Sequence, residues 1–309
     1  MAGCAESIEY RWAVCSTKLW APLRAAVRLA RGLSWTFGAY FLSLLASLAG
    51  LFSRSLAERW QRDISRRWIN GMPARLGVCI TIVGRLPQTP YFLVNNHITW
   101  LDFLVMNALC AARAVVMEEM VSMPVMGRLF HGLNAIPTRR VAEDTPACIA
   151  EMMATLRRGE DLMMAPEGNI SPGREVRRFR PRLFEAAVRC NFPVHYASIT
   201  YRTPKGCPSA AERVLFGPDP HYPWPDGRIP EGEFEGWGKQ RTFLGHLVRL
   251  LALPYAEAVV RFGPEPIRGA HPVQLAAALQ QAVSDIFVPV QGHPKKTSCD
   301  GLLARDRVG

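Results

Sequence analysis

One histidine and one aspartate interrupt the apolar run LVNNHITWLDFLVM, residues 93–106. On a continuous helix, five positions would turn Asp102 about 140° away from His97. The two side chains meet only if His97 ends a strand and Asp102 lies in the first turn of a helix, with Thr99 as the expected N-cap. A carboxylate on one ring nitrogen fixes the tautomer and makes the other nitrogen a better base. The pair is therefore a candidate general base and orienting group, and the nucleophile would come from the substrate, for example an alcohol.

The bare spacing of this pair is not specific. His221 and Asp226 in HYPWPD have the same separation. Pro223 and Pro225 lie between them and exclude a helix start there, so we interpret that copy as loop.

Two further strand ends carry polar residues. In MMAPEGNIS, residues 163–171, Glu167 is placed at the mouth of the sheet and Gly168 allows a sharp turn. Alone, this stretch would be better interpreted as a tight turn with a solvated glutamate. In AIPTRR, Arg139 and Arg140 follow an apolar strand, a natural place to bind a phosphate. The alternative is that both arginines are ordinary exposed surface residues.

A run of five arginines follows the PEG turn. It suits a solvated face, an anionic lipid contact, or a dock for the phosphates or acidic helices of an acyl carrier. Its members are Arg174, Arg177, Arg178, Arg180 and Arg182.

From residue 76 onward, short β-rich runs alternate with longer helical ones, which indicates an α/β fold with a mixed sheet covered by helices. In such sheets functional residues lie at the carboxyl ends of strands, where NNH and PEG both fall. We expect strands at 76–84, 91–96, 113–118, 134–140, 161–168, 193–202 and 256–267, and helices at 99–112, 124–131, 145–158, 181–190 and 271–287.

The amino-terminal part is predicted to associate with a membrane. Residues 33–52 carry no charge over twenty positions, enough to cross a core of roughly 30 Å. Basic residues spaced between apolar ones at 18–31 are typical of an interfacial helix. We expect a helical hairpin dipping into one leaflet; a single span or a core helix are the alternatives. The predicted domains are membrane-associating helices at 1–70, a catalytic domain at 71–290 with a proline- and glycine-rich insertion at 203–240, and a disordered tail at 291–309.

Composition limits the partners. The net charge of +11 over 309 residues predicts an anionic partner, but charge does not choose between nucleic acid, membrane and a phosphorylated substrate. No nucleic-acid module is recognisable, and the apolar stretch favours lipid. The eight cysteines form no CxxC pair, which favours a reducing compartment and no bound metal. Because the first twenty residues lack a secretory signal, we expect the cytoplasmic face, of the inner membrane if the source is bacterial.

Four blocks in order, NHITWLD, IPTRR, APEGN and FPVHYASITY, resemble those of the glycerolipid acyltransferase family, which includes 1-acylglycerol-3-phosphate acyltransferases. The resemblance implies that His97 takes the proton of a glycerol hydroxyl, that Asp102 orients His97, and that the alkoxide attacks the thioester of acyl-CoA or acyl carrier protein. It further implies that Glu167, Gly168 and Asn169 help bind the acceptor. Arg139 would hold its phosphate, and no cofactor is needed.

The chain departs from the family pattern in its second and third blocks. Gly132 lies seven residues before Arg139 instead of six, which leaves the choice between Arg139 and Arg140 open. Asn169 replaces the usual threonine. Lysophosphatidate is the expected acceptor, while glycerol 3-phosphate, another lysolipid and an acylated amino-acid lipid stay open. An alternative to the general-base mechanism is a thiol mechanism through Cys110. An alternative to an enzyme is a basic, membrane-attached binding protein without activity. The sequence does not fix the oligomeric state.

Overall fold

The computed structural model describes residues 20–139, 145–216 and 243–290. The strands are β1 (Val78–Val83), β2 (Phe92–Asn95), β3 (Arg113–Met117), β4 (Ile136–Thr138), β5 (Leu162–Met164), β6 (Val194–Arg202) and β7 (Ala256–Phe262). The helices are α2 (Ala21–Ala49), α3 (Arg54–Leu76), α4 (Leu101–Leu109), α5 (Glu118–Val121), α6 (Met126–Gly132), α7 (Thr145–Arg157), the 3-10 turn η1 (Arg182–Phe184), α8 (Glu185–Arg189), α9 (Ala210–Arg213), α10 (Phe243–Ala252) and α11 (Pro272–Ile286).

Within these residues the strands form one sheet in the order β1-β7-β6-β2-β5-β3-β4. Strand β7 is antiparallel to β6, and the other neighbouring pairs are parallel. The prediction of a mixed α/β sheet covered by helices is thus confirmed. The carboxyl ends of β6, β2, β5, β3 and β4 lie along one edge, because these strands run in the same direction.

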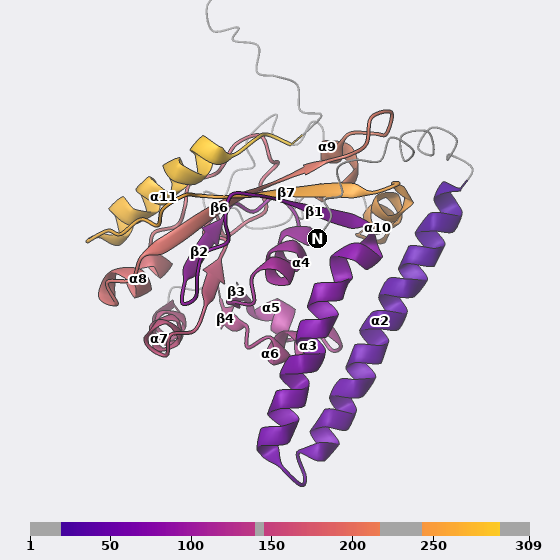
Figure 1. The fold of residues 1–309 in the computed structure, drawn as a ribbon, viewed down its shortest axis with the longest axis horizontal. Helices are drawn as coiled ribbons and strands as arrows, with labels where there is room; N and C mark the ends of the chain where they lie inside the picture. Colours follow the sequence, from indigo (N-terminus) through magenta and orange to yellow (C-terminus); the bar gives the residue numbers. More distant parts are fainter. Residues whose placement is uncertain (1–19, 140–144, 217–242, 291–309) are drawn as a thin grey trace, which may run out of the picture.

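The two faces of the sheet are buried by different helices (Figure 1). Along β2, Phe92 and Val94 belong to the core beneath α7, α8 and α11, whereas Leu93 belongs to the core beneath α3 and α4. This alternation is the period of two that a strand imposes. Because both faces are covered, β2 is apolar at every position until Asn95, as expected for a central parallel strand.

A long helical hairpin precedes the sheet (Figure 1). The turn at residues 50–53 joins α2 to α3, and the Ser53 hydroxyl caps α3 by accepting from Leu56 N. The uncharged stretch 33–52 therefore does not fold back on itself but continues α2 to its end. Trp68 and Ile69 on α3 are fully buried in the main core. The predicted domain boundary at residue 70 falls inside α3, which runs on to Leu76.

One face of α2 packs against the protein, and the other is apolar and exposed. Phe41 is 59% and Leu48 58% exposed, and α2 is long and apolar enough to cross a membrane by length and composition. Arg28 fixes α2 to the end of α10, where its guanidinium donates to the main-chain oxygens of Leu253 and Pro254 at 2.6 Å each. The predicted tail at 291–309 and most of the insertion at 203–240 lie outside the described residues.

Candidate active site

The carboxyl end of β2 and the start of α4 bring His97 and Asp102 together. His97 Nδ1 lies 2.9 Å from Asp102 Oδ2. The helix begins at Leu101, so Asp102 lies in its first turn, as expected. The prediction of Thr99 as N-cap is wrong, because the N-cap is Trp100 without a side-chain cap, and the Thr99 hydroxyl donates to Val214 O at 3.2 Å. The Asp102 carboxylate also accepts from Ile98 N at 2.6 Å and Thr99 N at 3.0 Å. These two N–H groups are therefore bound to Asp102 and are not free to stabilise an oxyanion.

Asp102 is a buried carboxylate with four hydrogen-bond donors. Its side chain is 2% exposed. The fourth donor, after His97 and the two main-chain N–H groups, is the hydroxyl of Tyr201 on β6, 2.9 Å from Oδ1. Such a set satisfies a buried charge without a neighbouring cation. Sequence reasoning missed Tyr201, because it is 99 positions away in an apolar strand.

The hydrogen bond to Asp102 orients the imidazole of His97 and leaves Nε2 as the nitrogen that can accept a proton. Since Asp102 accepts only, Nδ1 carries the proton and Nε2 is the basic nitrogen. Within the described part of the chain no hydrogen bond occupies Nε2, and a quarter of the His97 side chain is exposed. Asn96 secures the loop, because its amide bonds both main-chain groups of Ile199 on β6. The geometry required of a general base is therefore present, while the catalytic roles of His97 and Asp102 stay predictions.

Glu167 lies against the loop that carries His97. The side chain is 5% exposed, and it accepts from His97 N at 2.9 Å and from Arg177 N at 3.4 Å. Burial raises the pKa of Glu167 to about 8, although these main-chain donors favour the carboxylate. The contacts of Glu167 are thus with the main chain of the His97 loop and with the main chain of the arginine run. Its predicted role in binding the acceptor stays a prediction.

The raised pKa of Glu167 predicts a pH-dependent stability. Because the folded protein keeps this proton to about pH 8, whereas the unfolded chain loses it near 4.5, the free energy of unfolding should fall as pH rises between these values. Between pH 5.5 and 7.5 the loss should approach about 2 kcal/mol. Glu167→Gln, which mimics the protonated form, should remove this decline in denaturant titrations at several pH values. Glu175→Gln, an exposed site in the same segment, is the control; a Glu167→Gln curve parallel to wild type would contradict the assignment.

The turn after Glu167 is held tightly. Gly168 has φ +72°, a backbone conformation that favours glycine, and a Cβ there would lie 2.9 Å from Nε of the exposed Arg180 side chain. Ser171 N donates to His97 O at 2.7 Å. Asn169 is 8% exposed. The PEGNIS segment therefore fixes the main chain of His97 on one side.

The arginine run wraps around the same turn. Its backbone is anchored by the buried side chains of Val176 and Phe179 and by a hydrogen bond from Arg180 N to Pro166 O. Arg177 is half-buried. The exposed members, which can meet a ligand or a surface, are Arg174, Arg178, Arg180 and Arg182.

Arg139 follows β4 and faces Glu118, which follows β3. The guanidinium donates through Nε and Nη2 to the two carboxylate oxygens of Glu118, the second at 2.7 Å. The expected phosphate-binding arginine is thus already bound to a carboxylate, which sequence reasoning did not anticipate. Arg140 lies outside the described residues.

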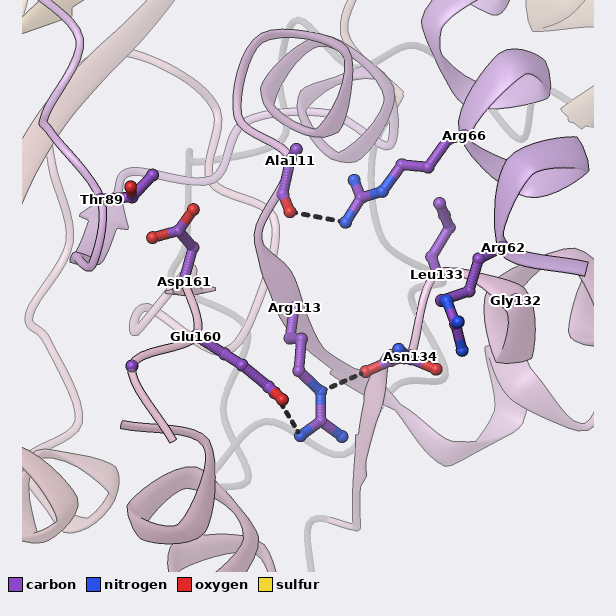
Figure 2. Close-up of a pocket in the computed structure, with 11 residues that line it drawn as sticks. Arg62, Arg66, Thr89, Ala111, Arg113, Gly132, Leu133, Asn134, Glu160 and Asp161 are labelled. Carbon is purple, nitrogen blue, oxygen red and sulfur yellow. Dashed lines mark hydrogen bonds and ion pairs between the residues drawn. The ribbon is translucent and has the colours of Figure 1, made fainter. Parts of the chain in front are cut away.

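A separate cavity of about 340 Å³ opens at the amino ends of β2, β3 and β5, the edge opposite His97 (Figure 2). Arg66 donates there to Ala111 O at 2.6 Å, and Arg113 to Asn134 O at 2.9 Å. None of the predicted site residues lines it. The candidate active site is therefore the carboxyl edge.

The chain resembles known acyltransferases in sequence. Residues 78–200 match the family model described as Acyltransferase. A lyso-ornithine lipid O-acyltransferase of Pseudomonas aeruginosa is 27% identical over 79% of this chain and 84% of that protein. A lyso-ornithine lipid O-acyltransferase of Rhodobacter capsulatus is 28% identical over 80% of this chain and 86% of that protein. A 1-acyl-sn-glycerol-3-phosphate acyltransferase of Neisseria meningitidis is 26% identical over 42% of this chain and 52% of that protein.

Among solved structures, the 1-acyl-sn-glycerophosphate acyltransferase PlsC of Thermotoga maritima aligns with a TM-score of 0.49 at 17% identity, covering 84% of this chain and 97% of that one. The match to the family model spans the strand ends that carry His97, Asp102 and Glu167. Residues 78–200 are thus similar to an acyltransferase domain, and the relatives that align over most of the chain are named as acyltransferases.

Proposed function

We propose that this enzyme transfers a fatty acyl group from a thioester donor to the free hydroxyl of a lysolipid, with His97 as general base. The observation that carries the proposal is the bond of His97 Nδ1 to buried Asp102, which leaves Nε2 open. Nε2 takes the hydroxyl proton as the oxygen attacks the thioester carbonyl carbon. The C–S bond then breaks, and the leaving thiolate receives the proton from the imidazolium. No acyl-enzyme forms.

The acceptor we propose first is a lyso-ornithine lipid. Two relatives with this name align over about four fifths of the chain and two more over 42% and 43%, whereas those named for 1-acylglycerol 3-phosphate align over 42%. A lyso-ornithine lipid carries a 3-hydroxyacyl chain in amide linkage, so it offers the hydroxyl that the reaction needs. Lysophosphatidate is the second candidate, supported by the relatives named for 1-acyl-sn-glycerol 3-phosphate. This order reverses the expectation from the sequence.

The test uses the purified full-length chain in mixed micelles. Each acceptor is supplied in turn with acyl-CoA and with acyl carrier protein, and the product is identified by lipid mass spectrometry together with release of free thiol. We expect acylation of lyso-ornithine lipid to exceed that of lysophosphatidate. If no hydroxyl-bearing lysolipid is acylated with either donor, the proposal is wrong.

We further propose that the donor approaches over the exposed arginines after the PEG turn, because CoA phosphates and the acidic helices of carrier proteins are both anionic. Four arginines without intervening acid except Glu175 give this segment a strong positive field. The KM for the donor should therefore rise with salt. Neutralising Arg178 should raise that KM without lowering kcat.

The exposed face of α2 is proposed to attach the enzyme to the cytoplasmic face of a membrane, where both donors occur. Phe41→Glu should reduce co-flotation with vesicles of anionic phospholipid, since a charge in the interface opposes burial of the helix. Val273→Glu on α11 is the matched control, because Val273 is also 59% exposed but lies on the far face of the sheet. Equal flotation of both variants and wild type would contradict this attachment.

A further inference from the structure

Four polar residues follow the carboxyl ends of neighbouring strands at matching counts from paired positions. Strand β2 pairs with β5 at Phe92 and Leu162, and β5 pairs with β3 at Leu162 and Arg113. His97, Glu167 and Glu118 are each five positions beyond those partners. Arg139 is three beyond Ile136, whose partner Val115 is likewise three before Glu118. In the order of the strands that they follow, from the proposed base outward, they are His97, Glu167, Glu118 and Arg139.

The outer two of these four residues form an ion pair that opens to solvent. The Glu118 side chain is 33% exposed and that of Arg139 is 56%. The hydrogen bond from Arg139 lowers the pKa of Glu118, so this carboxylate is ionised at neutral pH. The pair thus offers one negative and one positive group with no net charge, and Glu119 adds an exposed carboxylate beside it.

We propose that Glu118 and Arg139 bind the acceptor headgroup and select a zwitterionic amino-acid lipid, with an ammonium group on Glu118 and a carboxylate on Arg139. This proposal rests on the proposed acyl transfer by His97. A phosphomonoester carries a charge of about −1.5 to −2 at neutral pH and meets Glu118 before it can displace that carboxylate from Arg139. Because Glu118 neutralises the arginine that would otherwise bind a phosphate, the pair disfavours lysophosphatidate.

The span of the site agrees with this choice. Neighbouring strands are about 4.8 Å apart, so the end of β3 is about 10 Å from that of β2. In a lyso-ornithine lipid, nine bonds separate the reacting hydroxyl oxygen from the side-chain nitrogen, about 11 Å when extended at roughly 1.2 Å per bond. In 1-acylglycerol 3-phosphate, four bonds join the hydroxyl oxygen to phosphorus, about 5 Å on the same measure. The longer headgroup reaches the Glu118–Arg139 pair while its hydroxyl is at His97.

Glu118→Gln tests the proposal, because it removes the charge and keeps the shape. With the full-length protein in mixed micelles, kcat/KM for lyso-ornithine lipid should fall about tenfold or more, as expected for a lost charge-assisted hydrogen bond. The value for lysophosphatidate should stay level or rise. Arg139→Gln should also lower use of lyso-ornithine lipid. Glu151→Gln is the matched control, since it breaks an ion pair with Arg113 at the opposite end of β3 and should leave the ratio of the two acceptors unchanged.

Binding separates this inference from the proposed chemistry. In a His97→Ala background, titration with each lysolipid measures headgroup recognition without turnover, and Glu118→Gln should weaken only the lyso-ornithine lipid. If wild-type protein acylates neither acceptor, the proposed function fails, yet selective binding through Glu118 would still support this site. If Glu118→Gln changes both acceptors equally, in binding and in turnover, the pair only joins β3 to β4 and the inference is wrong.

Discussion

His97→Ala is expected to lower kcat/KM for acyl transfer by about 10²–10⁴-fold, the usual contribution of a positioned general base. Nε2 is the only basic ring position left once Nδ1 bonds Asp102. The fold should survive, since the loop is held through main-chain bonds of residue 97 to Glu167 and Ser171 that alanine keeps. Single-turnover release of thiol, compared with the thermal midpoint of each protein, measures both effects.

The control is His131→Ala, an exposed histidine on α6, which should act like wild type. Activity retained in His97→Ala would contradict the mechanism and direct attention to a covalent route through a protein nucleophile. Cys110 does not suit that role, because it is 2% exposed and burial raises its pKa to about 12. Thiol alkylation should accordingly leave the wild-type rate unchanged.

Much of the sheet was predictable because local pattern and tertiary placement agree. A central parallel strand is apolar on both faces, so runs such as YFLV stand out, and the first polar residues after them mark the carboxyl edge. The contact between His97 and Asp102 was predictable for the same reason. Helix geometry allows it only across a strand end, and the apolar strand before His97 supplies one.

The remaining features depend on partners distant in the sequence. Tyr201 reaches Asp102 across 99 positions, and Glu118 reaches Arg139 across 21, and neither pairing leaves a periodic signal. Thr99 has a good N-cap side chain, but its hydroxyl donates to Val214 O, 115 positions away, and Trp100 is the N-cap instead. Helix α10 was not predicted at all, although its apolar residues recur at helical spacing, because it follows an insertion rich in proline and glycine.

Asp102→Asn is expected to remove the negative charge beside His97 while keeping the hydrogen bonds that position it. Oδ2 accepts from His97 Nδ1, Ile98 N and Thr99 N, whereas Oδ1 meets only the rotatable hydroxyl of Tyr201. The asparagine oxygen should therefore take the Oδ2 position, and Tyr201 can turn its hydroxyl to accept from the amide. The tautomer of His97 is then kept, but the imidazolium formed during transfer loses its counter-charge. We expect kcat to fall about 10²-fold or more, with a small change in stability.

Two companion variants identify which property of Asp102 matters. Asp102→Ala leaves Ile98 N and Thr99 N buried without an acceptor, so it should cost about 2 kcal/mol or more of stability as well as activity. Tyr201→Phe removes one donor of four and should lower kcat less than tenfold. Denaturant titration and single-turnover rates on the three proteins distinguish these expectations. Asp102→Asn with nearly wild-type kcat would mean that Asp102 only shapes the loop, whereas loss of activity without loss of stability would show that its negative charge assists proton transfer at His97.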